Sequence, residues 1–177
     1  KVRSGGIIAF LTSRFTMDKA NSSVRKYINE RAELLGAIRL PNNTFSESAN
    51  TKAVSDIIFL QKRERPVILD EKKITTEADE QGNVMNSYFI SHPDMILGNI
   101  KKTKSMYGRE DLTVVPFEDR TLKQSLQTAI QSIQGHMDTV IIDENELESD
   151  DEIVMIPADP TVRNFSYTIV DGEIYFR

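Results

Sequence analysis

The sequence has no cysteine among its 177 residues, so disulfides and thiolate metal sites are excluded and a reducing compartment fits. It also has no apolar run close to the roughly 20 residues that a transmembrane helix needs. No signal peptide precedes the first apolar segment. We therefore expect a cytoplasmic protein that does not enter a membrane. Hydrophobic residues make up 39% of the chain and charged residues 28%, which is typical of a packed core.

The start of the chain holds no methionine and leads directly into an apolar segment, so we interpret residue 1 as a cut into a longer protein. Charge is distributed unevenly along the sequence. Residues 1–65 have a net charge of +6 and residues 66–177 a net charge of −11. A basic first third suits contact with phosphates, but an ordinary solvated surface explains it equally well.

Three apolar segments in the first part predict strands. Residues 7–11 form a continuous uncharged run, typical of a strand buried in a parallel sheet. Residues 34–40 and 53–62 predict two further strands, separated by a polar loop over 42–52. Only the first two strands are joined by a helical crossover, so only these two should be parallel, and the third should return antiparallel.

The crossover helix is predicted over residues 20–33. Asn21 or Ser22 can cap its first turn by accepting a backbone N–H bond. Its apolar positions repeat with a period of 3.6 residues and predict a buried stripe, formed by Val24, Tyr27, Ile28 and Ala32.

The second part predicts shorter elements and a final hairpin. A solvated acidic run is expected over 143–152, where seven of ten residues are Asp or Glu. Alternating apolar residues on either side of Asp171-Gly172 predict the closing hairpin. The other predicted elements are a polar excursion over 70–83, short helices over 86–90 and 93–97, and a longer helix over 120–134 that ends at Gly135.

An ordered set of segments is similar to the C-terminal half of adenine-specific DNA methyltransferases. More specifically, it resembles the methylase domain of very large phage, plasmid and conjugative-element proteins that also carry an SNF2-type helicase. Downstream segments resemble the same family. The segments that carry the resemblance are 5–13, 17–19, 24–28, 34–41, Phe45, 56–63, 88–98 and 162–177.

The resemblance implies an α/β fold, a partial Rossmann-like sheet made of the last three strands of a methyltransferase domain. Residues 7–11, 34–40 and 54–62 would be its fifth, sixth and reversed seventh strands. An α+β extension ending in a β-hairpin would follow, so the implied domains are 1–65 and 66–177. The whole parent, bacterial or phage-encoded, would transfer a methyl group from S-adenosylmethionine to the amine of adenine in DNA.

Both motifs that such enzymes need for chemistry are absent from this sequence. The methyl donor is held by a Gly-rich turn after the first strand, and the adenine amine by an Asn/Asp-Pro-Pro-aromatic segment. This chain has no Pro-Pro pair, and its only Gly-Gly, at 5–6, precedes a strand. We therefore assign no catalytic and no cofactor-binding residue, and we expect S-adenosylmethionine not to bind this chain.

Two groups of residues are candidates for contact with a ligand. Thr12, Ser13 and Arg14 follow the first strand, and ligands of open α/β sheets bind outside the carboxyl ends of strands. They predict the rim of an active cleft, although a polar strand terminus explains them as well. The candidates for DNA contact are Lys19, Arg25 and Lys26 around the crossover helix, and Asn50 and Thr51 in the long loop.

No metal site is predicted, because His92 and His136 are isolated and the acidic run lacks the spacing of a calcium loop. The expected partners are DNA, through the parent protein, and the remaining methyltransferase and helicase regions. The edge of strand 7–11 offers a further possibility, a homodimer. The alternative function is a non-catalytic DNA-binding or protein-interaction module.

Overall fold

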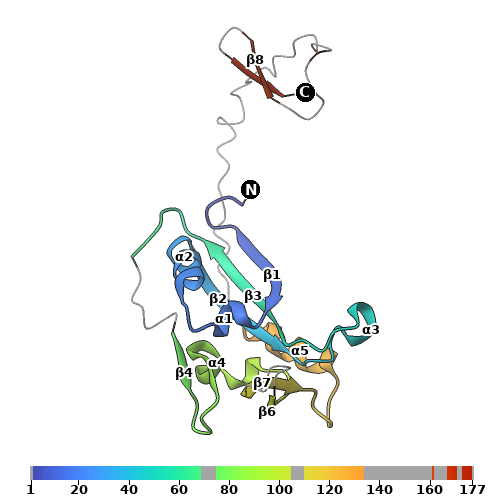
Figure 1. Cartoon of the computed structure of the whole chain (residues 1–177). Helices are drawn as coiled ribbons and strands as arrows, with labels where there is room; N and C mark the ends of the chain where they lie inside the picture. The colour runs from blue at the N-terminus through green and yellow to red at the C-terminus, as the bar shows by residue number, and fades with distance from the viewer. Residues whose placement is uncertain are drawn as a thin grey trace. The chain divides into compact units, whose positions relative to one another are not determined.

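The computed structural model describes residues 2–68, 75–104, 110–133, 161, 167–170 and 173–176. These residues form a mixed α and β protein with antiparallel sheets (Figure 1). The chain divides into two compact units, Lys1–Asp138 and Thr139–Arg177. The boundary that the resemblance implies, between 65 and 66, separates the central sheet from segments of the same unit. His136, Gly135 and the acidic run 143–152 lie outside the described residues.

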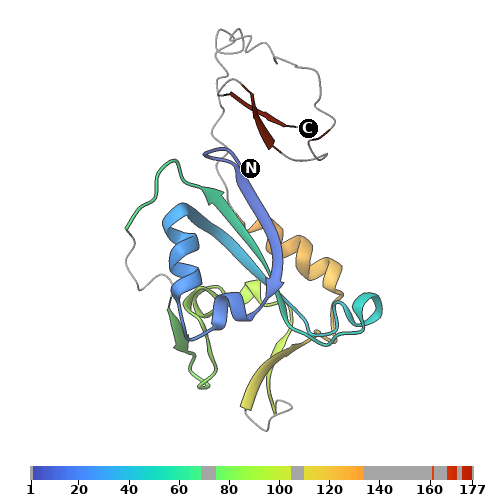
Figure 2. The ribbon, with the colours of Figure 1, turned by 45° about the horizontal axis from the view of Figure 1, so that its top comes forward.

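The central sheet contains β1 (Ile7–Ser13), β2 (Ala32–Leu40) and β3 (Ser55–Lys62) in the order β1-β3-β2. β3 is antiparallel to both neighbours, so β1 and β2 run in the same direction on either side of it (Figure 2). The three predicted strands and the reversal of the third are therefore confirmed. The first two strands do not pair with each other, because β3 lies between them.

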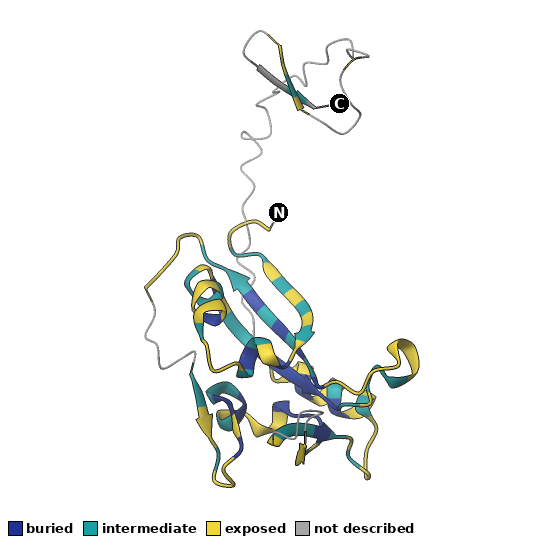
Figure 3. Ribbon diagram, viewed as in Figure 1, coloured by how far each residue is buried: buried dark blue, intermediate teal, exposed yellow. Residues whose placement is uncertain are grey.

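The prediction that residues 7–11 form a buried strand is wrong. Exposure alternates along β1, and Ile7 and Leu11 are 40% and 52% exposed (Figure 3). Among the described residues β1 pairs with β3 alone, so it is an edge strand, and the alternating exposure shows that one of its faces is uncovered. An uncharged run therefore does not by itself show that both faces of a strand are buried.

Two helices, α1 (Phe15–Asp18) and α2 (Ser23–Arg31), connect β1 to β2. The Oδ1 atom of Asn21 accepts the Ser23 N–H at 2.9 Å, so Asn21 rather than Ser22 supplies the capping side chain. The predicted apolar stripe is confirmed in part: Ile28 packs against the core and Ala32 is buried, but Val24 and Tyr27 are 57% and 60% exposed. Burial on α2 falls instead on Arg25.

β2 is the most buried strand of the sheet, and Ala37 and Ile38 are fully inaccessible. Its pairing with β3 shifts between Leu34 and Gly36, so Leu35 is the extra residue of a β-bulge. A Cβ atom on Gly36 would lie 3.1 Å from the Tyr88 hydroxyl and 3.2 Å from Ile133. The glycine therefore lets these two side chains approach the strand closely.

The remaining elements are short. The two predicted short helices, the longer helix and the final hairpin are confirmed, while the β6-β7 pair was not predicted. A single-turn helix, α3 (Ser46–Ala49), lies within the predicted polar loop. The other elements are β4 (Thr76–Ala78), β5 (Val84–Asn86), α4 (Ser87–Ser91), η2 (Pro93–Met95), β6 (Asn99–Lys104), β7 (Glu110–Val115), α5 (Leu122–Gln131), β8 (Tyr167–Val170) and β9 (Glu173–Phe176).

Segments that follow β3 pack onto the far edge of β2. The Leu97 N–H donates to the Arg39 carbonyl at 2.9 Å, and the Asn42 N–H donates to the Val114 carbonyl at 2.8 Å. Phe89, Met95 and Leu97 belong to the same buried cluster as the strand residues. Residues on both sides of position 65 thus build one core.

Candidate functional site

The carboxyl end of β1 carries the residues predicted to form a cleft rim. The Thr12 and Thr16 hydroxyl oxygens lie 2.7 Å apart, and the Ser13 Oγ accepts the Phe15 N–H at 3.4 Å. Both contacts join the end of the strand to α1. Arg14 turns inward and is only 8% exposed, so it does not lie on a rim.

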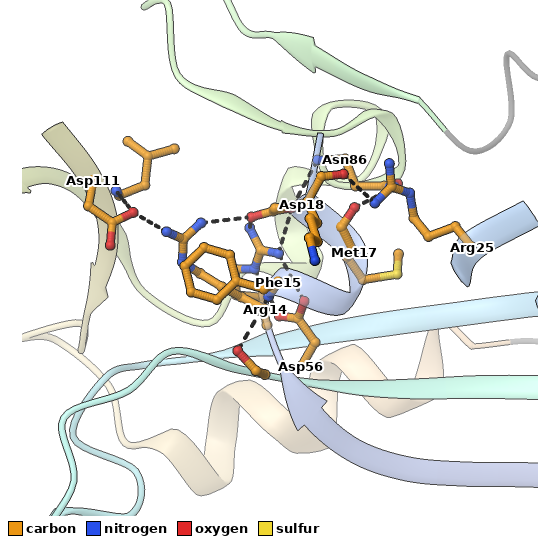
Figure 4. Close-up of polar contacts among 12 residues, drawn as sticks. Arg14, Phe15, Met17, Asp18, Arg25, Asp56, Asn86 and Asp111 are labelled. Atoms are coloured by element: carbon orange, nitrogen blue, oxygen red, sulfur yellow. Dashed lines mark hydrogen bonds and ion pairs between the residues drawn. The ribbon is translucent and has the colours of Figure 1, made fainter. Parts of the chain in front are cut away.

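Arg14 instead joins a buried polar group that we call the Asp18 cluster, formed by Arg14, Asp18, Arg39, Asp56, Asn86 and Asp111 (Figure 4). Arg39 is its centre. Its Nε and Nη2 atoms donate to the two oxygens of Asp56 at 2.8 and 2.9 Å, and its Nη1 and Nη2 atoms contact Asp18 at 2.8 and 2.9 Å. Planar bidentate contacts of this kind are the strongest that a guanidinium makes.

The cluster also joins the sheet to segments far away in the sequence. Arg14 contacts Asp18 at 3.2 Å and pairs with Asp111 of β7. The Asn86 N–H donates to Asp18 Oδ1 at 3.0 Å, and its side-chain amide donates to the Met17 carbonyl at 3.1 Å. Three separate elements, α1, β5 and β7, are therefore fixed to the sheet at one point.

Burial and charge oppose each other in this cluster. Burial alone would lower the pKa of the Arg39 guanidinium, but the hydrogen bonds and charges of Asp56 and Asp18 raise it above its ordinary value. Burial raises the pKa of the Asp56 carboxyl, and Arg39 counteracts that effect. We regard the pair as ionised, since both Asp56 oxygens accept short hydrogen bonds. The Arg39 guanidinium also lies 4.1 Å from the centre of the Phe89 ring.

The geometry of the Asp18 cluster indicates that it positions the carboxyl end of β1 and does not itself carry out a reaction. Asp18, Arg39 and Asp56 are at most 3% exposed at their side chains. Their charged atoms are occupied by one another, so no acid, base or nucleophile of the cluster faces a substrate. The cluster determines how the carboxyl end of β1 is held.

The candidates for DNA contact are dispersed. Lys19 and Lys26 are exposed, whereas Arg25 is 3% exposed and donates to the Lys19 carbonyl at 2.7 Å. Burial lowers the pKa of Arg25, and the nearby Asp18 charge opposes this. Arg25 therefore does not face a phosphate.

Asn50 and Thr51 are exposed at the end of α3, where Asn50 has a left-handed φ of 48°. Figures 1 and 2 show α3 well apart from α2, beyond the end of the sheet where β2 leads into the loop before β3. The structure therefore does not bring these two residues together with the lysines around α2.

His92 is exposed, follows α4 as its C-cap residue, and its ring stacks on the Tyr88 ring with 4.4 Å between the ring centres. In the described part of the chain, no group of three or more His, Asp or Glu side chains is arranged to hold a metal ion. None of the helices described there is long and apolar enough to cross a membrane.

One pocket was missed by the sequence reasoning. A cavity of about 340 Å³ lies between the loop after β2 and the first turn of α5, and its walls include Pro41, Leu97, Phe117, Arg120 and Ser125. The residue pattern Thr121-x-x-Gln124 marks the start of α5 and is the sequence signal that bears on this place.

Comparisons with known proteins identify no relative: neither a family model, nor a curated protein, nor a solved structure matches this chain.

Proposed function

We propose that this chain is the trailing flank of an S-adenosylmethionine-dependent, adenine-specific DNA methyltransferase domain, and that it is not catalytically complete alone. The observation that carries the proposal is the strand order β1-β3-β2, with β3 reversed between two strands of common direction. The resemblance implies the same strand directions along the chain, a fifth and a sixth strand followed by a reversed seventh. The helices α1 and α2 provide the crossover between β1 and β2.

The exposed edge of β1 supports the same proposal. The backbone groups of β1 that point away from β3 have no strand partner among the described residues, and Ile7 and Leu11 on its exposed face are large and apolar. The strand has no charged residue that would discourage pairing with another strand. A preceding strand of the parent sheet, with its own helices, would complete both the hydrogen bonds and the apolar cover.

The residues at the carboxyl end of β1 do not fit S-adenosylmethionine on their own. No Gly-rich turn follows the strand, and the charged groups of Arg14 and Asp18 are occupied within the Asp18 cluster. We therefore assign no step of methyl transfer to these residues. Their proposed role is to hold the edge that the donor-binding half would contact.

A reconstitution experiment tests the proposal. The chain is co-expressed with the roughly 200 residues encoded before it, an ordinary domain length, and methyl transfer to adenine in duplex DNA is measured with labelled S-adenosylmethionine. We expect transfer only when both parts are present. Leu11→Lys should abolish the association, because it places a charge on the exposed apolar face of this edge strand, whereas the matched control Val24→Lys should leave it intact.

Two results would contradict the proposal. One is full transfer by the preceding part without this chain. The other is an equal effect of Leu11→Lys and Val24→Lys. In addition, S-adenosylmethionine should not raise the melting temperature of the isolated chain, and a clear increase would reveal a donor site of its own.

A second candidate function, a protein-interaction module, is favoured by the same apolar edge. A homodimer would pair β1 with β1 of a second copy, and the uncharged strand offers no like-charge repulsion to such a pairing. Sedimentation equilibrium distinguishes the two functions: a dimer that Leu11→Lys converts to a monomer favours the module. A DNA-binding module has weaker support, since only Lys19 and Lys26 of its basic residues remain exposed candidates.

A further inference from the structure

Strand β6 carries a concentration of positive charge that the sequence analysis did not single out. Its six residues include no acid and three exposed lysines, Lys101, Lys102 and Lys104. Residues 66–177 have a net charge of −11, but the stretch 95–109 contains four basic residues and no acidic residue. This basic stretch is therefore an exception within its part of the sequence.

β6 is the outer strand of a two-stranded ribbon that projects from the region of the central sheet (Figure 2). Its partner β7 is fixed by the loop after β2. The Asn42 N–H donates to the Val114 carbonyl at 2.8 Å, and the Asn42 side-chain amide donates to the Thr113 hydroxyl at 3.0 Å. Among the described residues β6 pairs with β7 alone, so its other edge has no strand partner. The lysines thus lie on a strand that is anchored on one side and open on the other.

The ammonium groups of these lysines are available for a partner. In the described part of the chain, none of the three forms an ion pair. The Lys102 Nζ donates to the Gln81 carbonyl at 3.5 Å, which is longer than a strong hydrogen bond. The positive charge of β6 is therefore not consumed by contacts within the described chain.

The acidic residues beside β6 leave most of this charge uncompensated. Asp111 of β7 pairs with Arg14. The Asp79 carboxylate accepts two backbone N–H groups and one side-chain amide within its own turn. Glu110 lies opposite Lys104 in the ribbon, but no ion pair joins them in the described structure. One acid of the ribbon thus faces three lysines.

The spacing of the lysines suits an extended polyanion better than a single small anion. Residues of a strand are about 3.3 Å apart, so Lys101 to Lys104 place three charges along about 10 Å. One strand of duplex DNA carries one negative charge for each ~3.4 Å of its axis, which is a similar linear density. A two-stranded ribbon also fits the width of the major groove.

Both faces of β6 can contribute to such a contact. Successive residues of a strand point to opposite faces, so Lys102 and Lys104 share one face and Lys101 lies on the other. The flexible four-carbon stem of lysine lets side chains from both faces reach a backbone that follows the open edge.

We propose that β6 is a contact surface for the phosphate backbone of duplex DNA, bound through Lys101, Lys102 and Lys104. Contacts of this kind position a protein on DNA and do not read the base sequence. The surface is separate from the dispersed residues that the sequence predicted for DNA contact. The choice of DNA rather than another polyanion rests on the proposed function, whereas the edge of β1 takes no part.

Fluorescence anisotropy of a labelled duplex DNA of mixed sequence, titrated with the full chain, tests the proposal. We expect binding at low salt that weakens as salt increases. Lys→Gln at all three positions should lower the slope of log affinity against log salt by about 3. Between 50 and 200 mM salt, the unaltered chain should therefore lose about 40-fold more affinity than the variant. Because the three side chains are exposed, the melting temperature should not change.

A charge-matched control separates the surface from a general effect of net charge. It removes three exposed positive charges from other segments, by Lys52→Gln, Arg65→Gln and Lys123→Gln, and should keep the salt slope of the unaltered chain. The proposal is overturned if duplex DNA does not bind at low salt, if both triple variants lose the same slope, or if duplex RNA binds more tightly than the DNA.

Sedimentation of the β6 variant tests the opposing explanation, that the lysines only prevent the open edge from pairing with another chain. A variant that self-associates while its DNA affinity is unchanged would establish that explanation and overturn the proposal. All of these measurements use the chain without a methyl donor. A failure of DNA binding here is therefore distinguishable from a failure of the reconstituted methyl transfer.

Discussion

The two outer strands of the central sheet, β1 and β2, are both rich in apolar residues and have different environments. Both pair with β3, and both run in the same direction. In β2, most positions are buried, and Ile38 is fully inaccessible. In β1, every second residue is exposed, and Leu11 is 52% exposed.

The difference shows that the segments packed against a strand, rather than the amino-acid composition of the strand, determine how far its residues are buried. Segments after β3 supply the cover for β2: Leu97 bonds to its backbone, and Tyr88 and Ile133 approach it at Gly36. Among the described residues, none does the same for the free edge of β1. β2 also carries Arg39, whose ion pairs fix its position, while β1 carries no charge.

We expect the largest effect on stability from Arg39→Ala. The change leaves the Asp18 and Asp56 carboxylates buried without their common partner, so we expect a loss of about 3–5 kcal/mol of unfolding free energy in urea. The control is Arg31→Ala, whose exposed ion pair with Glu30 should contribute less than about 1 kcal/mol. Similar losses in the two variants would show that the Asp18 cluster does not stabilise the sheet.

A direct comparison of the two strands comes next. Ile38→Ala should cost about 3 kcal/mol, because it opens a cavity in a fully buried place. Leu11→Ala should cost less than about 1 kcal/mol, because half of the side chain is already in water. Chemical denaturation measures both. A loss for Leu11→Ala as large as that for Ile38→Ala would mean that the exposed face of β1 is covered in solution.

Thr121→Ala tests α5, the helix that leads to Ile133, which is one of the residues that cover β2 at Gly36. It removes the capping box of α5, and such a loss costs about 1 kcal/mol. Thr128→Ala is the matched control within the same helix, and we expect it to be neutral or slightly stabilising, since alanine favours the helix interior. Thermal unfolding followed by circular dichroism separates the two, and equal melting temperatures would argue against the cap.

The smallest effect concerns pH and Tyr88, which lies against β2. Burial raises the pKa of its hydroxyl, while a backbone hydrogen bond from Ala37 lowers it and the charge of Asp94 raises it. The folded pKa therefore lies above the unfolded value near 10. The stability that the neutral hydroxyl contributes is present below about pH 10 and lost as pH rises through the folded pKa.

Urea unfolding between pH 8 and 11 checks this sign. Tyr88→Phe should show a flatter alkaline decline than the unaltered chain, and Tyr27→Phe, at an exposed position, should follow the unaltered chain. An identical decline in all three proteins would remove Tyr88 as a source of the pH dependence.

The three central strands, the short helices and the last hairpin were predictable, because apolar periodicity and turn residues determine them locally. The β6-β7 pair was not, since Lys101, Lys102 and Lys104 make β6 mostly exposed and polar. A strand of this kind depends on its partner rather than on its own composition.

The Asp18 cluster could not be predicted from the sequence either. Arg39 and Asp56 were inside predicted strands, but their pairing depends on the register of β2 against β3. The burial of Arg25 likewise depends on how α2 is rotated against the sheet. Charged residues on a helix or strand predict solvent contact by default, and only tertiary packing reverses that expectation.

Because Leu35 forms a β-bulge, β2 tolerates the deletion of one residue at this position but not at residues 36–40. Removing Leu35 would join Leu34 and Gly36 into an uninterrupted ladder, with each still opposite its present partner in β3. Removing any residue between 36 and 40 would turn the rest of the strand over and send Ile38 or Arg39 to the wrong face. A change in chain length between the crossover helix and the Arg39 ion pairs therefore has one place where it leaves those contacts intact.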